Sequence, residues 1–451
     1  MRSISELARD LQSGKATSRG LVEAALAKID DPQGEGTRTF ISVDRDGALA
    51  QAEVSDDLRR RGIVPSPLAG LPISVKDLFD VAGQVTTAGS AVLRQTAPAN
   101  ADAPSIARLR AAGAVIIGRT NMSEFAFSGV GLNPHYGTPR NPHDRDPDDL
   151  AKGRIPGGSS SGAGVSVADG MAVAGIGSDT GGSVRIPAAY CGVTGFKPTQ
   201  RRIPIDGAYP LSASFDSIGP LAPSVDCCAV LDAVMAAEPM PELAPRTAGT
   251  LCLGVPQSVV LDDLDEGVAR AFEDALRRLR DAGARIVELA MPELAEIVEG
   301  NWVGGLITAD AYAVHRHQMA ERGDAYDQRI RARIMIGANH SAADYIDMMA
   351  ARRDLCSRAD AASAPFDALL APTVPMVAPR IEDLREDEDY GRLNLRSLRN
   401  TNLFNFLDRC AASVPCQTAG DLPVGLMVVR ETGADRDLLD VSAGIEAVLR
   451  G

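Results

Sequence analysis

The feature of this sequence that most constrains its fold is the alternation of short apolar runs with stretches of helical periodicity. Apolar runs of four to six residues occupy positions 71–75, 114–117, 171–176, 252–255, 368–371 and 424–429. Apolar residues at helical spacing are present at 105–112, 268–282 and 435–449. Runs of strand length that alternate with helices are typical of an α/β protein with helices on both faces of its sheet.

The rest of the chain extends this prediction. Residues 5–30 are predicted to form two short helices, residues 39–43 a further strand, and residues 308–363 a mainly helical region. The acidic segment 382–389 is predicted to be a solvated loop, as charge runs usually are. No internal repeat or clear linker divides the 451 residues, so we expect a single domain.

Charge and composition exclude several classes of function. The formal net charge is −14, which disfavours binding to phosphates and anionic lipid, and aromatic residues make up only 4%. Since no basic stripe is present either, the sequence predicts no direct nucleic-acid partner and no membrane partner. His is rare, with five residues, and the seven Cys include no Cys-x-x-Cys pair, so no metal site is expected.

Two observations concern location. The sequence begins Met-Arg-Ser-Ile-Ser-Glu-Leu, without the apolar segment of a signal peptide, and it has no apolar run of about 18 residues. Most Cys residues stand among apolar neighbours, as buried thiols in a reducing compartment do. We therefore expect a cytoplasmic protein.

Three polar segments stand out against this scaffold. The first ends an apolar strand with Lys76, although an isolated lysine at such a position usually just extends to solvent. The other two, at 155–162 and 177–187, combine Gly with Ser. Gly permits unusual backbone conformations and close approach of a substrate, and consecutive N–H groups in such loops can converge on an anion. Either loop alone is compatible with an ordinary turn. The two loops together with the lysine favour an active site.

Two other motif readings are weaker. Gly158-Ser-Ser-Ser-Gly162 fits the G-x-S-x-G nucleophile elbow of α/β-hydrolases, which requires a preceding strand and a histidine base. The preceding residues are polar and rich in Pro and Gly, and the candidate bases His315, His317 and His340 lie in a polar helical region where we expect solvent exposure. Neither loop has the G-x-x-x-x-G-K-[ST] pattern of a phosphate-binding loop.

Several longer blocks resemble the amidase signature family. They occupy residues 70–77, 118–125, 141–142, 156–162, 177–192, 195–199, 371–375 and 422–426. The resemblance implies the amidase-signature fold, an α/β fold with a large twisted mixed β-sheet covered by helices on both faces, in one domain over 1–451. Within it, 1–65 is an N-terminal helical region, 66–220 the signature core with the catalytic residues, and 221–451 the part that completes the sheet and the substrate pocket.

The resemblance also implies a role for each residue of these loops. Ser183 is implied as the nucleophile, Ser159, in a cis peptide, as the bridging serine, and Lys76 as the base. The implied oxyanion hole consists of the N–H groups of Thr180, Gly181, Gly182 and Ser183. The implied supporting residues are Ser160, Asp179 and Arg185.

These residue types suit the cleavage of an amide. A serine hydroxyl is a poor nucleophile until a neighbouring base takes its proton. A lysine acts as that base only when it is neutral, so its pKa must fall from about 10.4 to about 7–8. Backbone donors that hold the oxyanion contribute about 2.7–4 kcal/mol each. The implied reaction hydrolyses a small-molecule amide through a Ser-bound acyl-enzyme, with no cofactor and no metal.

The family includes free-standing amidases and the glutamine-hydrolysing amidase subunit of the tRNA-dependent amidotransferase. Many of the latter have Gly-Leu-Pro after a late Asn, whereas Asn405 is followed here by Phe-Leu-Asp-Arg-Cys-Ala. This departure favours a free-standing amidase, and the alternative is the amidotransferase subunit. A non-catalytic scaffold is disfavoured because Lys76, Ser159 and Ser183 are all present. Homodimers are frequent among relatives, so a homodimer is one assembly that the resemblance suggests.

Residues outside these motifs set the acyl pocket. The candidate substrate-binding residues are Met122, Phe127, Tyr136, Tyr209, Arg399 and the segment 302–307. Residues of these types lie in the core or in a surface ion pair at least as often as in a substrate pocket. The low aromatic content favours small or polar acyl groups.

Overall fold

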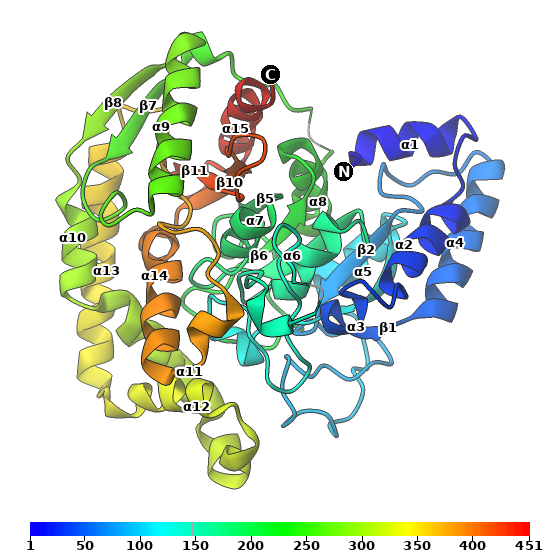
Figure 1. Ribbon diagram of the computed structural model, residues 1–451, viewed down its shortest axis with the longest axis horizontal. Helices are drawn as coiled ribbons and strands as arrows, with labels where there is room; N and C mark the ends of the chain where they lie inside the picture. Colours follow the sequence, from blue (N-terminus) through cyan, green and yellow to red (C-terminus); the bar gives the residue numbers. More distant parts are fainter. Residues whose placement is uncertain (147, 241) are drawn as a thin grey trace.

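The computed structural model describes residues 1–146, 148–240 and 242–451, and within them eleven strands form one mixed sheet (Figure 1). In spatial order the strands are β1 (Phe40–Val43), β3 (Val115–Thr120), β2 (Pro72–Lys76), β4 (Ala174–Ser178), β6 (Ile218–Ala222), β5 (Thr194–Lys197), β10 (Cys410–Pro415), β11 (Gly425–Arg430), β9 (Ala368–Pro372), β7 (Cys252–Pro256) and β8 (Arg285–Leu289). Two parallel groups, β3–β2–β4 and β9–β7–β8, flank an antiparallel centre.

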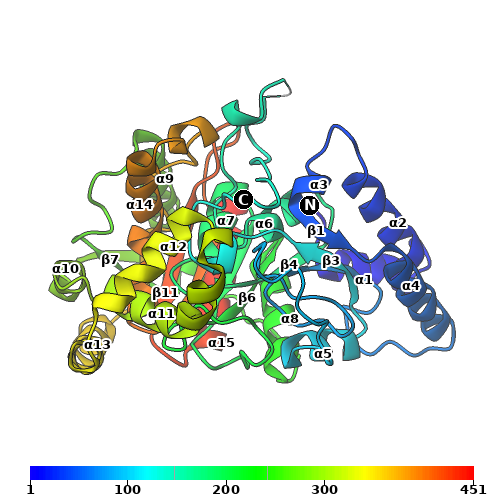
Figure 2. The same cartoon turned by 90° about the horizontal axis from the view of Figure 1, so that it is seen from below.

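Helices cover both faces of this sheet. They are α1 (Ile4–Gln12), α2 (Ser18–Ile29), α3 (Gly36–Thr39), α4 (Arg45–Arg60), α5 (Pro104–Ala111), α6 (Ser161–Ala168), α7 (Arg185–Cys191), α8 (Val225–Ala236), α9 (Glu266–Asp281), α10 (Pro292–Glu299), α11 (Trp302–Arg322), α12 (Gln328–Met335), α13 (Ala342–Ser363), α14 (Asp387–Phe406) and α15 (Asp435–Arg450). Figure 2 shows α6 and α7 on one side of the strands and α5, α8 and α15 on the other.

The covering helices explain the composition of the parallel strands. Every residue of β2, β3, β4 and β9 is buried, so these strands consist mainly of apolar residues and Gly and have no solvent-exposed face. β8, at the edge of the sheet, is partly exposed along its length. The predicted α/β class and large mixed sheet are therefore confirmed. Within the described ranges, no helix has the length and apolar character needed to cross a membrane.

Two local predictions need correction. The strand expected at 171–176 begins at Ala174 and continues to Ser178. The expected loop at 382–389 is mostly helical, because a 3₁₀ helix (Ile381–Leu384) covers its start and α14 begins at Asp387. Acidic residues in the first turn of a helix interact favourably with its dipole, so a solvated charge run can also start a helix.

The sheet brings two of the polar segments together. β2 and β4 are parallel neighbours, and Val75 of β2 pairs with Ile176 of β4. Both strands therefore end at the same edge, where the carboxyl ends of parallel strands usually present functional groups. Lys76 is the last residue of β2, and Ser178 is the last residue of β4.

Candidate active site

Lys76 is fully buried at the end of β2, and two serine hydroxyls surround its amine. Its Nζ donates to Ser159 Oγ at 2.7 Å and to Ser178 Oγ at 2.9 Å. Burial lowers the pKa of Lys76 to about 7, although the carboxylates of Asp179 and Asp216 oppose that shift. The amine is therefore poised to exchange a proton near neutral pH with a hydroxyl in direct contact.

Ser159 lies in the loop before α6, after a cis peptide bond between Gly158 and Ser159, as the family resemblance implies. The next residue, Ser160, joins this loop to the second one, because its N–H donates to the carbonyl of Ser183 at 3.2 Å. The Ser160 hydroxyl donates to the carbonyl of Ser178 at 3.3 Å. Lys76, Ser159 and the Ser183 backbone are thus held within one connected group.

Asp179 organises the loop that carries Ser183. Its buried carboxylate accepts hydrogen bonds from Arg185 Nε at 3.0 Å and Nη2 at 2.9 Å, and from Asn405 Nδ2 at 2.9 Å. It also accepts from the backbone N–H groups of Gly182 at 2.8 Å and Val184 at 3.1 Å. Burial alone raises its pKa, but the Arg185 guanidinium outweighs burial and holds the pKa of Asp179 well below its usual range. The loop is therefore built around a permanent negative charge.

This arrangement separates the four expected oxyanion donors into two kinds. The N–H of Gly182 is already engaged by Asp179 at 2.8 Å. Within the described residues, the N–H groups of Thr180, Gly181 and Ser183 have no protein acceptor. Free backbone donors beside a nucleophile suit a developing negative charge, so these three fit the expected role directly, and the oxyanion hole of all four residues stays a prediction.

Two residues that the sequence analysis missed complete the surroundings of Lys76. Ser178 supplies its second hydroxyl contact, and the carboxylate of Asp216 is one of the two charges that raise the lysine's pKa. Asp216 accepts from Thr180 Oγ1 at 2.6 Å and from the N–H of Leu211 at 2.9 Å, and burial raises its pKa to about 6. Ser178 lies inside the Ser/Gly block and was detectable there, whereas nothing local to Asp216 indicates its position.

A cavity of about 20 Å³ lies beside Ser183, and a second of about 20 Å³ adjoins it. The first is lined on one side by Thr180, Gly181 and Ser183. Its other walls come from residues 126–128 and from Leu211, Ile307, Arg333, Leu398 and Asn402. The helices α11, α12 and α14 supply Ile307, Arg333 and the pair Leu398 and Asn402, respectively.

The expected pocket residues divide between these cavities and other sites. Phe127 and Ile307 line the first cavity, and Tyr209 lines the second. Met122, Tyr136 and Arg399 line neither of these two cavities.

Each of those three residues has another structural place. Met122 is fully buried, and its carbonyl accepts from Asn133 Nδ2 at 2.7 Å. Arg94 stacks over the Tyr136 ring at 4.5 Å. Arg399 Nε donates to the neighbouring Asn400 Oδ1 at 3.1 Å. These contacts hold the three residues within the protein itself, and the expectation that they contact substrate stays a prediction.

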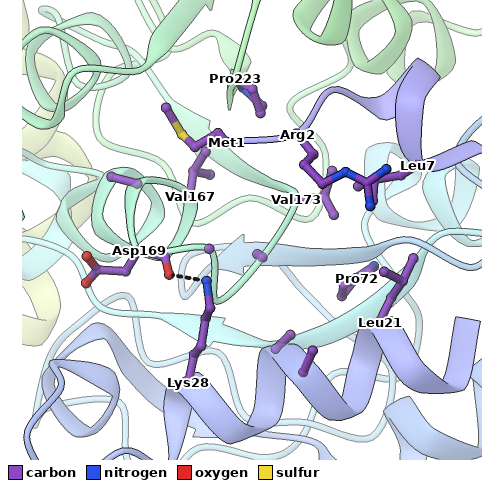
Figure 3. Close-up of a pocket in the computed structure, with 15 residues that line it drawn as sticks. Met1, Arg2, Leu7, Leu21, Lys28, Pro72, Val167, Asp169, Val173 and Pro223 are labelled. Atoms are coloured by element: carbon purple, nitrogen blue, oxygen red, sulfur yellow. Dashed lines mark hydrogen bonds between the residues drawn. The ribbon is translucent and has the colours of Figure 1, made fainter. Parts of the chain in front are cut away.

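A larger cavity, of about 360 Å³, lies between the N-terminal segment, α2 and the turn before β4 (Figure 3). Its lining is mainly apolar, with Leu21, Pro72 and Val173 among its residues, and Lys28 Nζ donates to the carbonyl of Asp169 at 3.1 Å. Neither Lys76 nor any residue of the loops 155–162 and 177–187 lines it. We therefore place the candidate active site at the smaller cavities beside Ser183.

His315, one of the three candidate bases of the nucleophile-elbow alternative, makes its contacts with other residues than Ser160. His315 was expected to be exposed, but it is fully buried against the rings of Phe125 and Tyr326, and burial lowers its pKa to about 4. Its Nδ1 contacts the Tyr326 hydroxyl at 3.2 Å, and the Ser160 hydroxyl is bonded to a backbone carbonyl instead. Among the described residues, no three His, Cys, Asp or Glu side chains group in a way that could hold a metal ion.

Comparisons with known proteins agree with this geometry. A sequence model of the Amidase family matches residues 20–439. The 2-amino-5-chloromuconic acid deaminase of Comamonas testosteroni is 36% identical over 416 residues, covering 90% of this chain and 87% of that protein. The AtzE subunit of 1-carboxybiuret hydrolase from Pseudomonas sp. (strain ADP) is 38% identical over 392 residues, with coverages of 83% and 82%.

Two further similarities extend over almost the full length. A glutamyl-tRNA(Gln) amidotransferase subunit of Koribacter versatilis is 31% identical and covers 97% of this chain and 96% of that protein. The crystal structure of an amidase superposes with a TM-score of 0.88 at 33% identity, covering 99% of this chain and 100% of that one.

Proposed function

This chain belongs to the amidase signature family and acts on amide C–N bonds, and from that premise we propose that it hydrolyses a carboxylic amide with Ser183 as nucleophile, Ser159 as bridge and Lys76 as base. The observation that carries the proposal is the 2.7 Å contact between the buried Lys76 Nζ and Ser159 Oγ. A lysine with a pKa of about 7 has a large neutral fraction at physiological pH, which general base catalysis requires.

The reaction follows from these positions. Ser183 Oγ attacks the amide carbon, and its proton passes through the Ser159 hydroxyl to neutral Lys76. The unengaged N–H groups of Thr180, Gly181 and Ser183 are proposed to hold the tetrahedral oxyanion. When the C–N bond breaks, Lys76 returns the proton through Ser159 to the leaving amine. Water then attacks the acyl ester and gives its proton through Ser159 to Lys76. When the bond between the acyl carbon and Ser183 Oγ breaks, that proton returns to Ser183 and the acid leaves.

A second candidate is the glutamine-hydrolysing subunit of a tRNA-dependent amidotransferase, supported by the full-length match, at 31% identity, to a protein of that name. The higher identities to the deaminase and to the carboxybiuret hydrolase subunit favour a small-molecule amidase instead. Two of these three relatives are named as subunits, so a partner chain is compatible with either function. The homodimer stays a prediction. So does the cytoplasmic location, which the absence of disulfides among the seven described cysteines supports.

Ammonia release from a panel of primary amides tests the proposal. The panel contains malonamide, indole-3-acetamide, mandelamide and glutamine, and each is assayed with the wild type, Ser183→Ala and Ser166→Ala. Ser166 is the matched buried control, because its hydroxyl bonds the Ala163 carbonyl at 2.9 Å and Ser74 Oγ at 2.8 Å and no residue of the proposed proton path. We expect Ser183→Ala to lose about 10⁴-fold or more in kcat and Ser166→Ala to stay within about threefold. Turnover that survives in Ser183→Ala overturns the mechanism, and turnover of glutamine alone favours the second candidate.

A further inference from the structure

One face of α14 lies against the loop that carries Ser183. The residues of this face recur at helical spacing and are Leu398, Thr401, Asn402 and Asn405. Leu398 and Asn402 line the cavity beside Ser183, and Asn405 Nδ2 donates to the carboxylate of Asp179 at 2.9 Å. Thr401 is fully buried between them and reaches the backbone of the loop itself.

Thr401 holds the peptide unit between Gly181 and Gly182. Its Oγ1 donates to the Gly181 carbonyl at 2.6 Å, and it lies 3.2 Å from the carbonyl of Leu398 in its own helix. The hydroxyl has one hydrogen, and only the first distance is in the usual range for an O–H donor. At the other end of the same peptide unit, the Gly182 N–H donates to Asp179 Oδ1 at 2.8 Å. Two separate side chains therefore hold the unit at its two ends.

Without these hydrogen bonds the Gly181–Gly182 peptide unit would rotate easily. It has glycine on both sides, so no Cβ restricts the two backbone dihedrals next to it. The following carbonyl, that of Gly182, accepts from the N–H of Ile186 at 2.7 Å, within the loop and the start of α7. The Gly181 carbonyl has Thr401 as its only donor among the described residues. The conformation of the loop at this point therefore depends on a side chain from α14.

The orientation of this peptide unit affects the free donors beside Ser183. The N–H groups of Gly181 and Ser183 stand on either side of the unit, and neither has a protein acceptor within the described ranges. A peptide unit is planar, so its rotation changes the direction of the backbone at both of its ends. An oxyanion donor has to point at the position that the oxygen will occupy, and loss of one such donor costs about 10²–10³ in kcat.

We propose that Thr401 is a positioning residue for catalysis: its hydroxyl fixes the Gly181–Gly182 peptide unit, and through it the backbone N–H groups that stabilise the oxyanion. The inference rests on the proposed function, because Ser183 defines where the oxyanion forms. Thr401 lines neither of the two cavities, so it acts through the loop and not on the substrate. Its loss should therefore slow the chemical step and leave substrate binding nearly unchanged.

Two variants that differ by one oxygen atom test the inference. Thr401→Ser keeps the hydroxyl, Thr401→Ala removes it, and both remove the methyl group. The substrate is the amide of the panel that the wild type hydrolyses fastest. We expect Thr401→Ala to lose about 10²-fold in kcat with KM within about threefold, and Thr401→Ser to stay within about threefold in both. Thr401→Val, which keeps the volume and lacks the donor, takes the place of Thr401→Ala if the latter does not fold.

Thr308→Ala is the matched control. Thr308 is also a buried helical threonine, but its hydroxyl donates to the Gly304 carbonyl at 2.8 Å within its own helix, α11. It loses the same atoms as Thr401→Ala, and we expect its kcat to stay within about threefold of the wild type. The inference is overturned by equal losses in Thr401→Ala and in either Thr401→Ser or Thr308→Ala, by an unchanged kcat in Thr401→Ala, or by a loss that lies in KM.

Failure of the proposed function gives a different result. Phenylmethylsulfonyl fluoride modifies a reactive serine by forming a bond from Oγ to sulfur with loss of fluoride, and intact mass measures the rate without any substrate. Modification that Ser183→Ala abolishes, and that Thr401→Ala slows by about 10-fold or more while Thr401→Ser does not, supports the inference. Equal rates in Thr401→Ala and Thr401→Ser overturn the inference alone. Equal modification of the wild type and Ser183→Ala, or a wild type that neither reacts nor hydrolyses an amide, overturns the proposed function and the inference with it.

Discussion

The amine of Lys76 lies 2.7 Å from the hydroxyl of Ser159, although 83 positions separate the two residues in the sequence. The contact exists because β2 ends beside β4, next to the loop that precedes α6. Since the amine is fully buried, the energy of its charged form depends on the few polar groups that reach it. The pH dependence of the enzyme's activity should therefore depend on those polar groups.

The pH dependence of the wild type should show this first. Lys76 acts as a base only when neutral, and burial lowers its pKa to about 7. Below that pH the amine is protonated and cannot accept the Ser183 proton, so kcat/KM should rise through an apparent pKa near 7 and level off above it. Measuring kcat/KM from about pH 5 to about pH 9 gives this value. A profile that is flat across this range would contradict the role of Lys76.

Asp216→Asn should move that profile. The Asp216 carboxylate raises the pKa of Lys76, so removing its charge should shift the acidic limb of kcat/KM to lower pH. Asparagine can still accept the hydrogen bond from Thr180 Oγ1, which limits structural damage. Asp226→Asn is the control, since that carboxylate contacts the Ser5 hydroxyl at 2.9 Å on an exposed part of the molecule. A purely structural role for Asp216 would lower kcat/KM at every pH without moving the limb.

Asp179→Asn should destabilise the protein strongly. Asp179 and Arg185 form an ion pair at 2.9 Å in which both side chains are fully buried. Removing the carboxylate leaves Arg185 as an uncompensated buried charge, which costs about 3–5 kcal/mol in the free energy of unfolding. The exposed pair of Asp57 and Arg60 is the control, and Asp57→Asn should cost about 0–1 kcal/mol. Urea titrations give the free energy of unfolding of each variant. Similar losses in the two variants would show that the buried ion pair stabilises the protein no more than the exposed one.

Gly182→Ala should abolish most of the activity. Gly182 has a φ of +130°, and a Cβ there would lie 2.1 Å from Thr401 Oγ1. The loop has to shift to relieve this contact, and a displacement of about 1 Å near a nucleophile can cost about 10²-fold in kcat. Gly391→Ala in α14 is the control, because a Cβ at Gly391 meets nothing within 4 Å. An equal fall of kcat in both variants, or a fall in neither, would contradict the prediction that activity requires this conformation of the loop at Gly182.

The sequence predicts those parts of the structure that are determined by residues close together in the chain. Apolar runs identify β2, β3 and β9, because a strand buried on both faces has no polar alternation. Lys76 is conspicuous for the same reason, as a charge at the end of such a run. The loop prediction for the acidic segment that begins α14 is wrong, because a run of charges indicates solvent exposure and does not determine the backbone conformation.

The residues that sequence did not predict depend on tertiary contacts. Arg333 differs from Arg331 only in which side of α12 it occupies relative to the cavity, and no local pattern encodes that. Asp216 reaches Lys76 through the antiparallel pairing of β4 with β6, whose first residue, Ile218, follows it by two positions. Arg399 was expected at the substrate, but the cavity-facing residues of the same helix are Leu398 and Asn402.

The two walls of the cavity beside Ser183 come from separate parts of the chain. Groups proposed to make and break bonds lie between residues 76 and 183, whereas the other walls, apart from residues 126–128 and Leu211, come from α11, α12 and α14, all beyond residue 300. Mutations at the cavity-lining positions of those helices can therefore alter which acyl group is accepted without replacing a residue of the proton path. An enzyme divided in this way can acquire new substrates in natural populations or by directed evolution, with its chemistry inherited intact.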